Sequence, residues 1–162
     1  LNRRGFIEDA EREIQRVSRG AQSFAIVLAD LDHFKAVNDR FGHSSGDKVL
    51  QVVTRVLQQR LREVDRHGRW GGEEFILLLP ETASAGAAVV ADSLRRAIEE
   101  SQFGIDNQES IGITMTFGIA IHRAGEKLES TIQRADSALY HGKKAGRNQV
   151  MIGKTPGLSV LG

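Results

Sequence analysis

A short acidic turn, Gly71-Gly72-Glu73-Glu74, stands directly before an apolar run over residues 75–79. Glycine has no Cβ, so two glycines allow a sharp turn and let a ligand approach the backbone closely. The apolar run predicts a buried strand. The pattern is therefore typical either of a hairpin with a solvated acidic tip or of a bend that holds fixed negative charge where a divalent cation and a phosphate can meet.

The composition excludes several classes of function. The chain has 162 residues, which suits one domain with a single core. Its 22 basic and 21 acidic residues give a net charge of +1, so no overall field attracts a nucleic-acid polymer, and we expect none as a partner. There is no cysteine, which excludes disulfides and thiolate chemistry. No apolar run reaches the length of a membrane span, and no signal peptide is visible.

The spacing of apolar residues predicts an α+β fold. We expect helices over residues 3–19, 33–40, 49–61, 84–98 and 128–139, the fourth capped by Thr82 or Ser84, and strands over 24–30, 68–70, 75–79, 113–121 and 149–152. Residues 42–45 and 102–110 are expected to be loops. After the first helix the order is that of a ferredoxin-like or palm-type βαββαβ core, with an antiparallel sheet covered by helices on one face. The domain is expected to span residues 1–154, followed by a flexible tail over 155–162.

Two carboxylates, Asp30 and Asp32, follow the first predicted strand. In a palm-type core this strand lies beside the central hairpin, so Asp30 is expected to face Glu73 and Glu74. Mg²⁺ takes oxygen ligands and is usually held by one or two carboxylates together with substrate phosphates. Lys35, one turn further on, could meet a phosphate tail. Asp32 is either a metal ligand or the N-cap of the next helix.

Asn38 and Asp47 flank the predicted loop at 42–45. A carboxylate and an amide that face one pocket match the Watson–Crick edge of guanine, because the carboxylate accepts from N1–H and N2–H. The alternative is that Asp47 only caps its own helix.

Two further groups of charged residues are each open to two interpretations. Lys143 and Arg147 follow the last predicted helix and either interact with its dipole or reach over a triphosphate. Arg62 and Asp65 precede the acidic turn and form either a surface pair or a docking site for a phosphate and a guanine edge.

Taken together, these segments resemble the GGDEF family of diguanylate cyclases, in its Gly-Gly-Glu-Glu-Phe variant. The resemblance runs from Leu1-Asn2-Arg3-Arg4 to Gly146-Arg147-Asn148. It includes Asp30-Leu31-Asp32-His33-Phe34-Lys35, Phe41-Gly42-His43 with Gly46-Asp47, Arg69-Trp70-Gly71-Gly72-Glu73-Glu74-Phe75 and Ala135-Asp136-Ser137-Ala138-Leu139-Tyr140.

The resemblance implies a reaction and a partner arrangement. The family condenses two GTP into cyclic di-GMP and two pyrophosphates, with one GTP on each domain of a homodimer. An upstream sensory domain commonly brings the two domains together. The chain starts without Met, so we expect a cytoplasmic domain of a longer protein, such as a membrane-anchored sensor.

The resemblance also assigns roles to individual residues. Mg²⁺, or Mn²⁺ as a substitute, would be held by Asp30, the Leu31 carbonyl, Glu73 and Glu74. Glu73 and Glu74 would be the catalytic residues. Asn38 and Asp47 would bind guanine. Arg62 and Asp65 would form an inhibitory product site of the Arg-x-x-Asp type. The remaining substrate-binding residues would be Lys35, His43, Gly71, Gly72, Lys143 and Arg147.

Two other functions compete with an active cyclase. A catalytically silent domain that binds GTP or cyclic di-GMP as a receptor would typically have lost a carboxylate at position 73 or 74, and both are present. A nucleotidyl cyclase or polymerase palm of similar architecture would lack the Gly-Gly-Glu-Glu-Phe turn and the Arg62/Asp65 pair.

Overall fold

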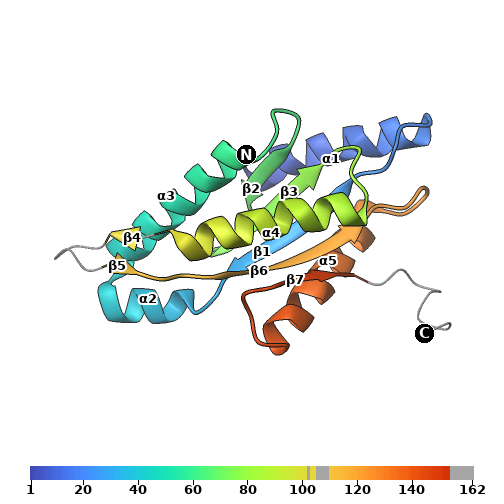
Figure 1. Ribbon diagram of the computed structural model, residues 1–162. Coiled ribbons are helices and arrows are strands. Elements are labelled where there is room, and N and C mark those ends of the chain that lie inside the picture. Colours follow the sequence, from blue (N-terminus) through green and yellow to red (C-terminus); the bar gives the residue numbers. More distant parts are fainter. Residues whose placement is uncertain (102, 105–109, 154–162) are drawn as a thin grey trace.

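The computed structural model describes residues 1–101, 103–104 and 110–153 (Figure 1). The predicted α+β class is confirmed. The elements are α1 (Arg3–Ser18), β1 (Ala25–Leu31), α2 (Phe34–Phe41), α3 (His43–Arg60), β2 (Arg66–Arg69), β3 (Glu74–Leu79), α4 (Ser84–Glu100), β4 (Phe103–Gly104), β5 (Ser110–Ile111), β6 (Met115–Ile121), α5 (Leu128–Lys144) and β7 (Val150–Ile152).

Five of the strands form the main sheet, in the order β2-β3-β1-β6-β7. The pairs β2–β3, β3–β1 and β1–β6 are antiparallel as expected, whereas β7 joins β6 in parallel. All seven residues of β1 are buried, because this strand lies in the middle of the sheet.

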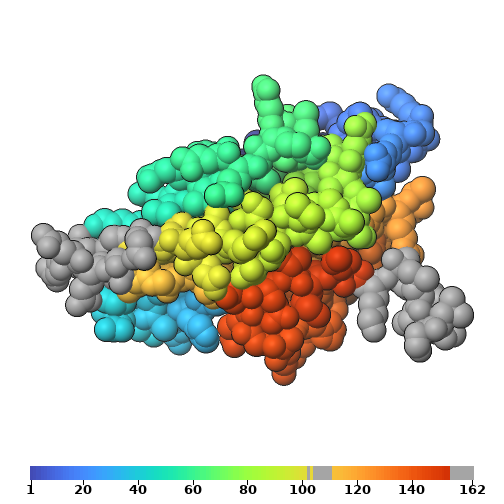
Figure 2. All heavy atoms as spheres, viewed as in Figure 1, coloured from blue at the N-terminus to red at the C-terminus, as the bar shows by residue number. Residues whose placement is uncertain are grey.

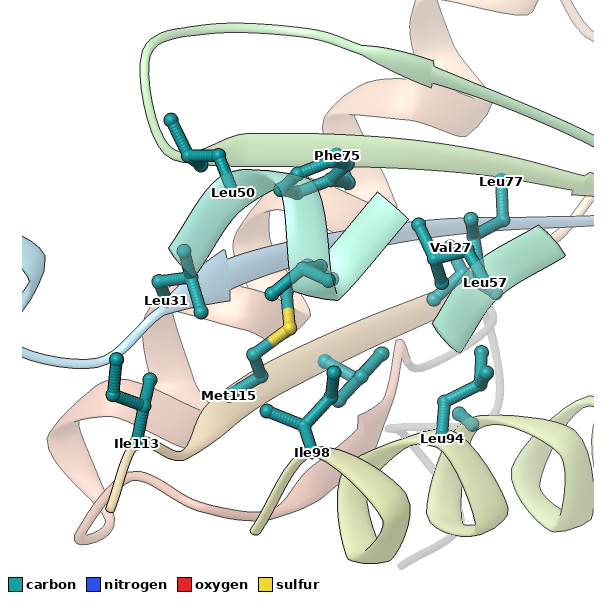
Figure 3. Close-up of a cluster of buried hydrophobic side chains, with 14 of the residues drawn as sticks. Val27, Leu31, Leu50, Leu57, Phe75, Leu77, Leu94, Ile98, Ile113 and Met115 are labelled. Carbon is teal, nitrogen blue, oxygen red and sulfur yellow. The ribbon is translucent and has the colours of Figure 1, made fainter. Parts of the chain in front are cut away.

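Helices cover both faces of the sheet, so the prediction of helices on one face is wrong. Val27 and Leu31 of β1 pack in a core with α3 and α4 (Figure 3). Ile26 and Leu28, which point to the opposite face, pack with α1 and α5. The space-filling view shows α4 covering the first of these faces, with α3 along one of its sides (Figure 2). An uninterrupted apolar strand requires this arrangement, because both of its faces must be buried.

Two local predictions about helix starts are wrong. Residues 43–45 are not a loop, because α3 already begins at His43 and only Gly42 separates it from α2. Gly42 has φ 90°, a left-handed value that glycine adopts without strain, so a single residue suffices for the break. Neither Thr82 nor Ser84 caps α4, whose N-cap is Ala83 without a side-chain hydrogen bond.

The segment 102–110 is not wholly a loop, because Phe103–Gly104 pairs with Ser110–Ile111 in a small second sheet. The strand expected at 113–121 begins at Met115. Residues 102 and 105–109 and the tail predicted over 155–162 lie outside the described residues. Among the residues that are described, no helix has the length and apolar character needed to cross a membrane.

Candidate active site

The acidic turn lies beside the end of β1. The β2–β3 hairpin is closed by the Trp70 amide, which donates to the Glu74 carbonyl at 2.8 Å. Glu74 is paired with Asp30 in the β-ladder, and the Leu31 amide donates to the Glu73 carbonyl at 3.3 Å. Asp30 thus lies beside Glu73 and Glu74 at one end of the sheet, as the sequence predicted.

The two glycines do not make this turn through unusual backbone conformations. The predicted sharp turn is present as a bend over residues 71–73, and neither Gly71 nor Gly72 has a positive φ. A Cβ at Gly72 would meet nothing within 4 Å, whereas one at Gly71 would lie 3.1 Å from Glu74 Oε2. Open space above Gly72 agrees with the other part of the prediction, that a ligand can approach the backbone there.

Burial and mutual repulsion perturb the carboxylates. Asp30 is only 4% exposed, and burial raises its pKa. Lys143 opposes this rise, while the negative charges of Glu73 and Asp32 add to it. The pKa of Glu74 is also raised, by burial first and then by the charges of Asp30 and Asp136. Such a cluster is stabilised by an added cation.

The donor set fits a hard divalent cation. Asp30 Oδ1 is buried and has no hydrogen-bond partner, so one oxygen acceptor of this carboxylate is left over. The available groups are carboxylate and carbonyl oxygens, which Mg²⁺ and Mn²⁺ prefer over softer metals. Among the described residues, no three His, Cys, Asp or Glu side chains gather closely enough to hold an ion by themselves. We therefore expect substrate phosphates to complete the coordination.

Glu74 also faces a cavity beside the acidic turn. It lines a cavity of about 510 Å³ together with Arg3, Trp70 and Asp136. Arg3 closes one side of this cavity, because it donates to the Trp70 carbonyl at 2.8 Å and lies 3.9 Å from the centre of the Trp70 ring.

Basic residues approach the cluster from α5. Lys143 forms an ion pair with Asp30 Oδ2. Lys143 and Arg147 also line a cavity of about 370 Å³ with Tyr140 and Lys144. The structure thus places Lys143 at the carboxylate of Asp30, and Arg147 in the same basic cavity as Lys143.

The predicted guanine-binding residues come from adjacent turns of α2 and α3. A Cβ on Gly46 would overlap Asn38 Oδ1, so the Asn38 amide lies against the residue that precedes Asp47. Asp47 is exposed and lines a cavity of about 410 Å³. It is the fifth residue of α3 and not its first, so the alternative of simple capping is wrong. Lys35 and His43 are exposed in the first turns of α2 and α3.

Asp32 is not the N-cap of α2, because His33 holds that position. Its buried carboxylate instead accepts from Thr114 Oγ1 and Thr116 Oγ1, each at 2.7 Å, and from the Asn148 amide at 3.0 Å. Sequence reasoning missed these three partners. The available signal was weak: two threonines alternate with apolar residues at the start of β6.

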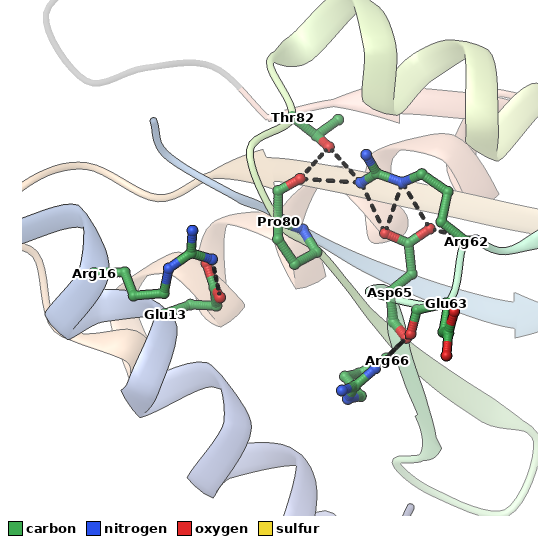
Figure 4. Close-up of polar contacts among 8 residues, drawn as sticks. All are labelled: Glu13, Arg16, Arg62, Glu63, Asp65, Arg66, Pro80 and Thr82. Carbon is green, nitrogen blue, oxygen red and sulfur yellow. Dashed lines mark hydrogen bonds and ion pairs between the residues drawn. The ribbon is translucent and has the colours of Figure 1, made fainter. Parts of the chain in front are cut away.

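Arg62 and Asp65 bond to each other (Figure 4). The two nitrogens Nε and Nη2 of Arg62 lie 3.2 and 2.8 Å from Asp65 Oδ1. Arg62 Nη2 also donates to the Pro80 carbonyl at 3.0 Å and to Thr82 Oγ1 at 3.1 Å. The Arg62 side chain is 53% exposed, whereas that of Asp65 is 1% exposed. The pair is therefore preformed at the surface, in a partly exposed position.

Comparison with known proteins agrees with this geometry. The family model described as diguanylate cyclase, GGDEF domain, matches residues 1–149. Diguanylate cyclase DgcP of Pseudomonas aeruginosa is 39% identical over 151 residues, which cover 93% of this chain and 22% of DgcP.

Solved structures agree as well. The GGDEF domain of DgcB from Caulobacter crescentus in complex with c-di-GMP is similar with a TM-score of 0.91 and 30% identity, over 96% of this chain and 89% of that one. The active GGEEF domain of a diguanylate cyclase from Vibrio cholerae gives a TM-score of 0.88 and 32% identity, over 96% of this chain and 98% of that one.

The fold and the acidic turn define a palm-like α+β domain with a carboxylate cluster at one end of its sheet. Within that class, the chain belongs to the GGDEF family of diguanylate cyclases. It spans between 22% and 36% of the length of the first three curated relatives it matches.

Proposed function

We propose that this domain condenses two molecules of GTP into cyclic di-GMP with release of two pyrophosphates. The observation that carries the proposal is that Asp30, whose buried carboxylate oxygen Oδ1 lacks a partner, lies beside Glu73 and Glu74 of the acidic turn. Membership of the GGDEF family and relatives named as diguanylate cyclases support the same reaction.

In this proposal Asp30, the Leu31 carbonyl, Glu73 and Glu74 hold Mg²⁺ or Mn²⁺. The bound cation would polarise the α-phosphate and lower the pKa of the attacking ribose 3′-OH. Glu73 would help to remove the proton from that hydroxyl. Phosphoryl transfer needs alignment and charge neutralisation more than covalent participation by the protein, and an acidic turn on a rigid hairpin provides alignment.

The remaining residues bind substrate. Asn38 and Asp47 read the guanine edge, and a site built to bond that edge rejects adenine strongly. Lys35, Lys143 and Arg147 neutralise the β- and γ-phosphates. Gly71 and Gly72 leave room for the nucleotide, and His43 lies at the start of α3 on the substrate side.

Each domain holds one GTP, so two domains must face each other as a homodimer. We also propose that an upstream sensory domain controls this pairing and that the domain works in the cytoplasm, where GTP and Mg²⁺ are available. Cyclic di-GMP is proposed to bind at Arg62 and Asp65 and to inhibit synthesis. The c-di-GMP complex of the DgcB domain supports binding of the product by this fold.

The test is to fuse a parallel coiled coil before Leu1 and to incubate the dimer with GTP and Mg²⁺. We expect a cyclic dinucleotide, identified by mass spectrometry. Glu73→Gln should lower its rate of formation about a hundredfold or more, because the variant loses a charge at the metal. The matched control Glu11→Gln removes the same charge from the exposed face of α1 and should retain the rate. A dimer that binds GTP without converting it would favour the receptor function instead.

A further inference from the structure

The segment after α5 has an unusual backbone. Gly146, Arg147 and Asn148 have φ values of 124°, 62° and 47°. Residues with a Cβ rarely adopt such left-handed values, and two successive ones are rarer still. This conformation persists only where surrounding contacts hold it.

Those contacts converge on Asn148. Its backbone amide lies 3.0 Å from both Asp32 Oδ2 and Thr116 Oγ1. Its side-chain oxygen accepts from Arg95 at 2.9 Å, and its side-chain nitrogen donates to Glu99. The residue is therefore held both from the sheet and from α4.

Asp32 is the only carboxylate in direct contact with the Asn148 backbone among the described residues, and it is 6% exposed. Both of its oxygens accept hydrogen bonds: Oδ1 from Thr116, and Oδ2 from Thr114 and Asn148. Its own amide donates to the Thr114 carbonyl at 2.9 Å. Asp30, two residues earlier, differs because its Oδ1 has no partner. The carboxylates of Asp30 and Asp32 therefore have different roles: Asp30 keeps an oxygen without a partner, whereas both oxygens of Asp32 are hydrogen-bonded.

Asn148 directly follows Arg147, which lines the basic cavity with Lys143. We propose that Asp32 is a positioning residue for the triphosphate: through the Asn148 backbone it fixes the left-handed segment that aims Arg147 at the β- and γ-phosphates. This inference rests on the proposed function, because it assumes that GTP is the substrate.

The experiment is a double-mutant cycle on binding. Calorimetry with Mg²⁺ compares the α,β-methylene analogue of GTP with GMP, which lacks the phosphates that Arg147 would reach. Asp32→Asn should weaken binding of the GTP analogue about tenfold, which is the effect of losing one charge-assisted hydrogen bond. It should leave the affinity for GMP unchanged. Arg147→Ala should weaken binding of the GTP analogue by a similar factor. The double variant should bind no more weakly than Arg147→Ala, because Asp32 acts through Arg147.

A second readout does not depend on nucleotide. The Asn148 amide should exchange with deuterium faster in Asp32→Asn, while Glu11→Gln serves as the charge-matched control. If Asp32→Asn unfolds, Thr114→Val removes one donor to the carboxylate and should give a smaller loss of the same kind.

Three results would overturn the inference: unchanged affinity for the analogue, additive losses in the double variant, or an equal loss of GMP binding. A fall in Mn²⁺ affinity without nucleotide would show that Asp32 serves the metal instead. If the unaltered domain binds no GTP analogue at all, the proposed function fails together with the inference. If it binds the analogue but Asp32→Asn has no effect, only the inference fails.

Discussion

At the scale of single residues, Arg62 and Asp65 show how a surface pair can also be a binding site. The buried Asp65 carboxylate orients the half-exposed Arg62 guanidinium, and the Arg62 backbone amide donates to Asp65 Oδ2 at 2.8 Å. Hydrogen bonding to Asp65 is the main cause that raises the pKa of Arg62. A guanidinium held in this way is preorganised for a phosphate or a guanine edge.

Arg62→Ala is therefore expected to relieve product inhibition. Half-inhibition by added cyclic di-GMP should require at least about tenfold more of it, because a bidentate charged contact is lost. The uninhibited rate should stay within about twofold. The matched control is Arg96→Ala, since Arg96 is an exposed arginine of α4 that forms an ion pair with Asp92. Unchanged inhibition in Arg62→Ala would leave this pair a structural contact.

Glu126 is a second residue whose environment makes a measurable prediction. Burial would raise its pKa, but hydrogen bonds from Arg134, Thr131 and the Arg123 amide outweigh this and lower it to about 2. The folded chain thus binds the proton less tightly than the unfolded chain, in which the pKa is near the ordinary 4.5. The stabilisation is full above pH 4.5 and is lost as the pH falls towards 2.

Glu126→Gln should accordingly lower the free energy of unfolding by about 1–3 kcal/mol at pH 7. Urea denaturation at several pH values checks this, and the difference from the unaltered chain should shrink between pH 4.5 and pH 3. Glu129→Gln, on the exposed first turn of α5, three residues after Glu126, should change stability by less than about 0.5 kcal/mol. An equal loss in both variants would contradict the assignment.

The sequence predicted that Asp30 lies beside Glu73 and Glu74, because strand ends and turns carry strong local signals. It could not separate the roles of Asp30 and Asp32, because these depend on Thr116 and Asn148, which lie far along the chain. It also predicted the sharp turn at Gly71 and Gly72, which is present although neither glycine has a positive φ.

At the scale of elements, the apolar spacing located the helices and most strands to within a few residues. The continuous apolar run of β1 already indicated that helices cover both faces of the sheet. The apolar spacing within a helix, however, does not show which face of the sheet that helix covers. The start of α3 was missed because a helix break of one residue depends on the φ of Gly42.

One close contact between a helix and the sheet occurs at Gly118 of β6. A Cβ there would overlap the Ala135 carbonyl oxygen and the Leu139 amide nitrogen, which belong to the backbone of α5 and cannot rotate away. Because α5 carries Lys143, this contact sets how near the basic residues come to the acidic turn.

Gly118→Ala should push α5 away from the sheet and lower the free energy of unfolding by about 1–3 kcal/mol. It should also weaken binding of a GTP analogue more than that of GMP. Thermal unfolding and calorimetry measure the two effects. The control is Gly112→Ala, because a Cβ at Gly112 would meet nothing within 4 Å and its φ is not positive. Equal stability of both variants would contradict the close packing.

At the scale of the whole molecule, the proposed site is half of a reaction centre. In the proposed function, the carboxylates, Asn38 with Asp47 and the basic cavity of one domain bind one nucleotide, and the proposed reaction joins two. In a two-fold arrangement, each 3′-OH attacks the α-phosphate held by the other domain. The rate must therefore depend on how often two domains meet face to face.

This dependence gives a prediction without any substitution. At concentrations well below that of half-dimerisation, the rate of cyclic di-GMP formation should rise with the square of the domain concentration, because the active species is a pair. Fusion to the coiled coil should make the rate proportional to concentration and raise it most at the lowest concentrations. The coiled-coil fusion carrying Glu73→Gln is the control for contaminating activity. A rate proportional to concentration in the unfused domain, under conditions where sedimentation shows monomers, would mean that a single domain completes the reaction.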